Sequence, residues 1–206
     1  FAMPAAPARL IHSIEDAKGP INLDYYPVQV SAMPTSSGST MSADQLLEFV
    51  RRNVNIFLDK LPDGARFNPL DATVDGAAWA PLFLQTGFPG AVLSLDIFSS
   101  NLPVDGGSVV LAEIGSDHWI FSTMWTPDDL GHPVSGNRQF GYMRGAAGEF
   151  IFYTRGADRT TKRLDNILQD SVFGGGHRLW LSFQRRLASF VNNNGGLATI
   201  GTASSQ

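Results

Sequence analysis

Five side chains able to take part in polar chemistry lie within eleven residues of the chain, in the stretch TPDDLGHPVSGNR. They are Asp128, Asp129, His132, Ser135 and Arg138. A serine hydroxyl becomes a nucleophile when a neighbouring base takes its proton, so His132 and Ser135 could support hydrolase-like catalysis, with the charged residues assisting. The spacing is not that of a nucleophile elbow, and the glycines and proline between these residues are typical of turns. We therefore predict a hydrogen-bonded loop and keep catalysis as the alternative.

A metal site is the second chemistry that these residue types could support. Asp117 and His118, together with Asp128, Asp129 and His132, could gather around a divalent cation. The chain has no cysteine, however, and no pair of histidines at the four-residue spacing of a helical zinc motif. The four histidines are far apart, at positions 12, 118, 132 and 177. We expect no metal and no other cofactor.

Two arginines further along the chain suggest a site for a polar head group. If 145–148 forms a tight hairpin, Arg144 pairs with about residue 148 or 149, and Arg138 pairs with about Arg155. Both guanidinium groups then lie at one end of the sheet, where they could receive a carboxylate or a phosphate. Like charges so close together repel, so we expect a bound anion or Asp158 between them.

Aromatic residues cluster in the same part of the chain. Most of them are needed to fill the core of a domain of this size, and some could line a cavity. Together with the polar side chains above, they give the candidate ligand-binding set: His132, Arg138, Arg155, Trp119, Phe121, Tyr142, Tyr153 and Trp180.

Composition excludes several classes of protein. The 206 residues are 43% hydrophobic and 17% charged, which is typical of a globular protein rather than a disordered one. A formal net charge of −4 argues against nucleic-acid binding, which needs a clustered excess of Lys and Arg. No apolar run approaches the roughly 20 residues that cross a bilayer. We expect no membrane span, and the compartment and the oligomeric state stay open.

The apolar pattern predicts an α+β domain. Turn-rich connectors separate five runs with strand character, which should pair in succession as an antiparallel meander. These runs are residues 91–98, 107–114, 118–125, 138–144 and 148–155. An earlier strand lies near 23–30. A helix capped by Ser42 should run to about residue 61, where Pro62 follows.

The C-terminal third predicts two more helices. The first covers 159–172 and ends at Gly174–Gly176. The second covers 177–192, and its apolar residues recur every three or four positions, so one face should pack on the sheet. We expect an irregular arm at 1–20, one domain at 21–196 and a frayed tail at 197–206. Segment 62–90 gives no clear pattern, and its apolar residues 79–88 could be core or the lip of a pocket.

This order of elements resembles the helix-grip fold of the START and polyketide-cyclase superfamily. There a curved antiparallel sheet wraps a long C-terminal helix, with an apolar cavity between them. The text GHPVSGNRQF followed by GEFIFYTRGADR is similar to the penultimate hairpin of some bacterial members. The resemblance implies binding of a hydrophobic ligand, and it carries over no catalytic residue.

Three hypotheses follow. The first is binding of a small hydrophobic or amphipathic ligand between the sheet and the C-terminal helix. The second is a secreted or effector-type enzyme that uses the His132, Ser135 and Arg138 loop with Asp128 or Asp129. The third is a structural or interaction module. A cavity rimmed by His132 and the arginines favours the first two hypotheses, and a solid core favours the third.

Overall fold

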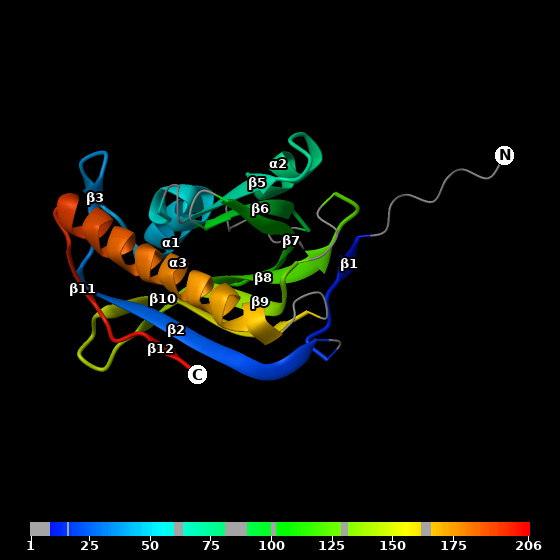
Figure 1. Ribbon diagram of the computed structural model, residues 1–206. Helices are drawn as coiled ribbons and strands as arrows, with labels where there is room; N and C mark the ends of the chain where they lie inside the picture. The colour runs from blue at the N-terminus through cyan, green and yellow to red at the C-terminus, as the bar shows by residue number, and fades with distance from the viewer. Residues whose placement is uncertain are drawn as a thin grey trace.

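The protein folds as a curved sheet that wraps a long helix (Figure 1). The computed structural model describes residues 9–15, 17–59, 64–80, 90–99, 102–128, 132–161 and 166–206. The helix, α3, spans Asn166–Asn193 and crosses the inner face of the sheet. The predicted α+β class is confirmed: the antiparallel meander lies against a C-terminal helix.

The helices and strands alternate irregularly in the first half of the chain and then run as a meander. In chain order they are β1 (Leu10–Ile11), β2 (Lys18–Ala32), β3 (Thr35–Ser36), β4 (Ser39–Thr40), α1 (Ala43–Arg52), the 3-10 helix η1 (Val54–Phe57), β5 (Gly64–Pro69), α2 (Val74–Trp79), β6 (Val92–Ser99), β7 (Leu102–Ile114), β8 (His118–Trp125), β9 (Val134–Arg144), β10 (Phe150–Thr160), α3 (Asn166–Asn193), β11 (Leu197–Ile200) and β12 (Ser204–Ser205).

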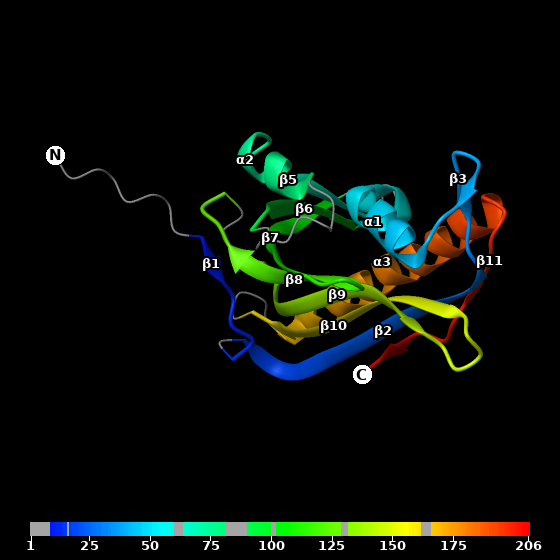
Figure 2. The ribbon, with the colours of Figure 1, turned by 180° about the vertical axis from the view of Figure 1, so that it is seen from behind.

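In the described part of the chain, ten strands make one antiparallel sheet. The path runs β11-β2-β10-β9-β8-β7-β6-β5, with β1 on β8 and β12 on β2. Strands β6 to β10 pair in sequence order, as predicted. Register shifts interrupt the pairing of β6 with β7 and of β7 with β8. Such bulges increase the local twist, and Figure 2 shows the resulting curvature from behind.

The core lies between the inner face of the sheet and one side of α3. Trp180, Phe183 and Leu187 on α3 are buried, as the apolar spacing predicted. Phe140 on β9 meets the rings of Trp180 and Phe183 edge to face, at centroid distances of 5.6 and 5.5 Å. This packing fixes where α3 lies on the sheet, and so which strands face its N-terminal half.

Helix α1 covers the other part of the inner face. It starts at the predicted cap, where Ser42 and Gln45 exchange hydrogen bonds in a capping box. It ends at Arg52, about nine residues earlier than predicted, and η1 continues the chain. Arg51 is fully buried and bonds Glu48 and the carbonyl of Trp79. These bonds tie α1 to the end of α2.

Segment 62–90, which gave no pattern in the sequence, contributes β5 and α2. The carboxylate of Asp75 accepts the N–H groups of Asp71 and Val92, which links α2 to the start of β6. The apolar segment 79–88, considered as core or pocket lip, falls outside the described residues after Ala80.

The predictions for the C-terminal third were wrong at three points. Strand β10 runs to Thr160, so no helix starts at residue 159. Helix α3 continues through Gly174–Gly176 instead of breaking there. Each glycine costs a helix only about 1 kcal/mol relative to alanine, which packing of the rest of α3 can offset. The tail is not frayed, because β11 and β12 pair with β2.

The predicted irregular arm is partly wrong as well. In its described residues, β1 pairs with β8 and Arg9 forms an ion pair with Asp75. Strand β2 also begins at Lys18, within the segment expected to be irregular. The pairing partners lie more than 50 residues away in the chain, so local sequence carries no sign of them.

The register of the β9–β10 hairpin differs from the prediction and decides which side chains share a face. Arg144 pairs with Phe150 rather than with residue 148 or 149, and Arg138 pairs with Gly156 rather than with Arg155. Residues 145–149 connect the paired Arg144 and Phe150, and Gly148 adopts a φ of 89° within this connection. Because side chains alternate along a strand, this shift places Arg155 on the outer face.

Candidate functional site

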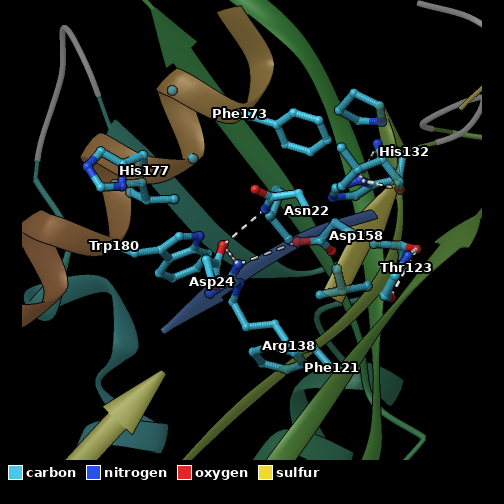
Figure 3. A pocket seen from close by; sticks show the side chains of 18 of the residues that line it. Asn22, Asp24, Phe121, Thr123, His132, Arg138, Asp158, Phe173, His177 and Trp180 are labelled. Atoms are coloured by element: carbon cyan, nitrogen blue, oxygen red, sulfur yellow. Dashed lines mark hydrogen bonds and ion pairs between the residues drawn. The ribbon is translucent and has the colours of Figure 1, made fainter. Parts of the chain in front are cut away.

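A cavity of about 180 Å³ lies between the sheet and the N-terminal half of α3, partly open to solvent. Its size is comparable to that of an engineered cavity of about 150 Å³ that holds benzene. Most of the wall is apolar, and a few polar side chains converge on it (Figure 3). The lining residues are Asn22, Asp24, Tyr26, Gly64, Phe67, Leu95, Val109, Phe121, Thr123, His132, Pro133, Val134, Gly136, Asn137, Arg138, Asp158, Phe173, Gly175, Gly176, His177, Arg178, Leu179, Trp180 and Ser205.

Three neighbouring strands supply the polar part of the wall. Register places Arg138 on β9, Gly156 on β10 and Asp24 on β2 in one row across the sheet. The next row holds Gly136 and Asp158 opposite each other. Arg138 and Asp158 therefore each lie beside a glycine of the neighbouring strand, which gives their side chains room to lie across the sheet.

The two glycines are needed for this arrangement. A Cβ at Gly156 would lie 2.4 Å from Nη2 of Arg138, and a Cβ at Gly136 would lie 2.5 Å from Oδ1 of Asp158. Any side chain at these positions would displace the charged groups. The glycines thus make the space in which the guanidinium reaches from β9 across β10 to β2.

Arg138 is already engaged on several sides. Its Nη2 donates to Oδ2 of Asp24 at 2.6 Å and lies 3.5 Å from Oδ2 of Asp158. Its Nη1 donates to Oγ1 of Thr154 at 3.4 Å. The indole of Trp180 covers one face of the guanidinium, with 4.2 Å from its carbon to the ring centroid. The arginine therefore links three strands of the wall through its two Nη atoms.

The carboxyl group of Asp158 has a pKa above that of an ordinary Asp. Burial raises its pKa to about 6, against the lowering effect of Arg138 and with a smaller raising effect of Asp24. At neutral pH the cluster carries two carboxylates and one guanidinium. Below about pH 6, Asp158 takes up a proton and the charges of Asp24 and Arg138 balance.

The carboxylate of Asp24 is only half satisfied. Its Oδ2 accepts from Arg138 and, at 3.4 Å, from Nδ2 of Asn22. Its Oδ1 is buried and has no hydrogen-bond partner among the described residues. An ionised oxygen in such a position costs stability unless something donates to it.

His132 is a neutral group in the cavity wall. Burial lowers its pKa to about 4, so the imidazole is uncharged at neutral pH. Its Nδ1 lies 3.0 Å from the carbonyl oxygen and 3.2 Å from the amide nitrogen of Val134. Its Nε2 is buried, again without a partner in the described ranges. The ring packs against Gly107, where a Cβ would come within 2.3 Å of it.

On the helix side of the cavity, α3 contributes the hydrogen bond between His177 and Tyr26 and two glycines without side chains. His177 accepts from or donates to the hydroxyl of Tyr26 at 2.8 Å, which joins α3 to β2. Burial, followed by the nearby charge of Asp24, raises the pKa of Tyr26. Gly175 and Gly176 line the cavity, and a Cβ at either would meet no heavy atom closer than 4.0 Å. Their missing side chains leave part of the cavity open.

The structure brings together four of the residues proposed from sequence as ligand-binding. His132, Arg138, Phe121 and Trp180 line the cavity. The other four lie elsewhere. Trp119 is fully buried and stacks on Phe140, and the hydroxyl of Tyr142 bonds Asp44 of α1. Tyr153 and Arg155 lie together against the far side of the sheet, with the guanidinium 5.2 Å from the ring.

The residues considered for hydrolysis do not converge. Ser135 is three positions from Arg138 on an unbroken strand, so the two point to opposite faces. Nδ1 of His132 bonds backbone atoms of Val134 rather than the serine. Asp128 is exposed, and Asp129 lies outside the described residues.

The residues considered for a metal are spread out too. His118 lies at the sheet end, 2.7 Å from Asp117 and 3.1 Å from Glu113. Burial acts to lower the pKa of His118, but the two carboxylates outweigh it and raise the pKa. Within the described ranges, no three His, Asp or Glu side chains form a group that could hold a metal ion.

Sequence reasoning missed Asp24, Tyr26, Asp158 as a wall residue, and His177. A signal for the first two exists. Val28 and Val30 are buried on β2, and counting back in steps of two places Tyr26 and Asp24 on the same inner face. An acidic residue in phase with buried valines marks a charge inside the fold. Leu23, where the predicted strand 23–30 begins, lies out of phase with them and is exposed.

Comparison with known proteins gives the fold. The di-domain ARO/CYC StfQ from the steffimycin biosynthetic pathway aligns with a TM-score of 0.52 and 11% identity, covering 87% of this chain. The chain has the helix-grip fold. It spans about half of StfQ, 52% of that chain. Two further solved structures align less well: protein NE0264 from Nitrosomonas europaea (TM-score 0.45, 12% identity, 83% of this chain and 95% of that one) and Ara h 8.0201 (0.42, 8%, 81% and 99%).

No protein-family model matches the chain, and a search of curated proteins finds no match. No helix in the described residues is both long and apolar enough to cross a membrane. The sheet topology and the alignment with StfQ confirm the helix-grip resemblance that the order of elements indicated.

Proposed function

We propose that this helix-grip protein binds a small hydrophobic or amphipathic molecule in the cavity between its sheet and α3. The observation that carries the proposal is a mostly apolar cavity lined by Asp24 and His132, each of which has one buried polar atom without a hydrogen-bond partner in the described chain. Ligand sites combine an apolar wall with a few polar groups that orient the ligand.

The glycines of α3 support the same conclusion. A glycine inside a helix costs about 1 kcal/mol relative to alanine, and the helix has three in a row at Gly174–Gly176. Alanine would clash with nothing at Gly175 or Gly176. These glycines therefore leave space next to the cavity, and they are not required by close packing. A bound ligand could occupy that space.

A neutral fluorescent probe tests the proposal. N-phenyl-1-naphthylamine should bind with one saturable site per chain, with a rise in emission as it leaves water. Gly176→Leu fills part of the cavity and should weaken this binding at least about tenfold, which corresponds to about 1.4 kcal/mol. Gly76→Leu places the same side chain on α2, away from the cavity, and should leave probe binding unchanged.

Two results would contradict the proposal. One is the absence of saturable probe binding to the folded wild-type protein. The other is an equal loss of binding in both glycine variants, since that would place the probe outside the cavity. If neither result is found, native mass spectrometry of protein from its own source would identify the natural ligand as an added mass.

A further inference from the structure

Among the charged groups of the cavity wall, the guanidinium of Arg138 is already paired, whereas the carboxylate of Asp24 has an oxygen without a donor in the described chain. Arg138 is the less exposed of the two arginines among the described lining residues, and its Nη atoms contact Asp24, Asp158 and Thr154 while the Trp180 ring covers one face. Arg178 also borders the cavity, but it is exposed, so water and salt screen its charge. A carboxylate or phosphate that approached Nη2 of Arg138 would have to displace Asp24 from a 2.6 Å ion pair.

The carboxylate of Asp24, in contrast, has an oxygen that accepts no hydrogen bond in the described chain. Asp24 lines the cavity, and its Oδ1 is buried and has no donor in the part of the chain that is described. Oδ2 of the same group is paired, so the free oxygen belongs to a carboxylate that Arg138 keeps in place. Figure 3 shows Asp24, Asp158 and His132 around the same space, below the ring of Phe173.

His132 adds a second polar atom on the far side of that space. When Nδ1 donates to the carbonyl of Val134, at 3.0 Å, Nε2 is an acceptor. In the other tautomer Nδ1 accepts from the Val134 amide and Nε2 donates. A hydroxyl group can pair with either form, because it both donates and accepts.

We propose that the cavity selects ligands whose polar end donates a hydrogen bond, as a hydroxyl or an amine does, and that Oδ1 of Asp24 receives it. This inference rests on the proposed function and adds the chemical class of the ligand. It also reverses the expectation from sequence that paired arginines receive an anionic head group. Arg138 orients Asp24, and Asp24 contacts the ligand.

The proposal is tested by measuring the affinity of the wild-type protein for four probes that share one ring system. Naphthalene, 2-naphthol, 2-(aminomethyl)naphthalene and 2-naphthoate are compared by displacement of N-phenyl-1-naphthylamine. The two donors should bind at least about tenfold more tightly than naphthalene, since a hydrogen bond to a charged group is worth that much. Naphthoate should bind more weakly than naphthalene. The ratio of the two donors separates a neutral from a cationic ligand.

Asp24→Asn gives the matched variant. The amide keeps an oxygen for Arg138 and presents an N–H donor where Oδ1 was. The preference should therefore reverse, with 2-naphthol losing its advantage and naphthoate gaining affinity. Asp59→Asn, at an ion pair with Arg185 on the outside of the fold, should keep the wild-type order.

The outcomes are distinct. Naphthoate binding as tightly as 2-naphthol to the wild-type protein would overturn the donor proposal, and so would equal affinities for naphthalene and 2-naphthol. In both cases ligand binding itself stands. Failure of all five compounds to bind would overturn the proposed function as well. If Asp24→Asn does not fold, the wild-type series alone decides.

Discussion

Nη2 of Arg138 lies 2.6 Å from Oδ2 of Asp24, although the two residues belong to strands that are not neighbours. The intervening strand passes between them at Gly156, over which the guanidinium lies. The ion pair therefore links β9 to β2 across β10, inside the concave face of the sheet. Oδ1 of Asp24 is the carboxylate oxygen that has no hydrogen-bond partner in the described chain.

A side chain at Gly156 should break this arrangement. Gly156→Ala places a methyl group 2.4 Å from Nη2 of Arg138, so the guanidinium must move away from Asp24. We expect a loss of about 1–3 kcal/mol in the free energy of unfolding, from urea titration, as for other overpacked sites.

Gly76→Ala is the matched control for that substitution. A Cβ at Gly76 on α2 would meet only Pro69, at 4.0 Å, and alanine favours a helix. This variant should be neutral or slightly stabilising. Equal effects of the two substitutions would show that the space over Gly156 is not needed.

The packing of α3 on the sheet predicts a larger effect. Phe183 is 2% exposed and packs edge to face on Phe140. Phe183→Ala should lower the free energy of unfolding by about 3–5 kcal/mol through lost burial and the cavity left behind. Ile200→Ala, at a residue that is 50% exposed on β11, should cost well under half of that. A small loss at Phe183 would mean that α3 is not held by this stripe.

Patterns that repeat along the chain made much of this fold predictable. The alternation of strands β6 to β10 and the three- and four-residue spacing of Trp180, Phe183 and Leu187 each record a buried face, because burial acts on every residue of an element. The Ser42 cap was readable for a related reason, since its hydrogen bonds are local. Together these signals were enough for the order of elements that defines the fold.

The site was less predictable, because it depends on pairing between distant strands. Asp24 and Arg138 are 114 residues apart, and nothing local says that they meet. An error of one residue in the β9–β10 register moved Arg155 to the wrong face. The glycines of α3 were interpreted as a helix break, because local propensity does not record the cavity beside them.

Arg138 and Arg155 should therefore behave differently when each is replaced by Met. Arg138→Met leaves two buried carboxylates without their cation and should cost about 3–5 kcal/mol of stability at neutral pH. Arg155 is exposed and bonds Gln139 on the outer face, so Arg155→Met should change stability by less than about 0.5 kcal/mol. It should also leave the affinity for N-phenyl-1-naphthylamine unchanged. Loss of probe binding in Arg155→Met would contradict the observed register.

Two buried groups of the cavity wall should give the stability opposite pH dependences. The pKa of Asp158 is about 6 in the folded protein against 3.8 for an ordinary Asp, so the folded state holds this proton more tightly. Its contribution is present at pH 4 and is lost as the pH rises through about 6. The pKa of His132 is about 4 against 6.5, so its contribution is present above pH 6.5 and is lost as the pH falls toward 4. Between pH 4 and 6 the two slopes oppose each other.

Asp158→Asn separates the two effects, because the amide has the shape of the protonated carboxyl group and does not titrate. At or below pH 3.8, the ordinary pKa of an Asp, the variant and the wild-type protein should unfold at about the same urea concentration. At pH 7.5 the variant should be more stable, by at most roughly 3 kcal/mol, because the wild-type protein must keep an ionised group buried there. The variant should also gain stability as the pH rises from 4 to 6.5, since the slope from His132 is no longer opposed. A variant less stable than the wild-type protein at pH 7.5 would mean that the bond from Arg138 outweighs the cost of burying the Asp158 charge.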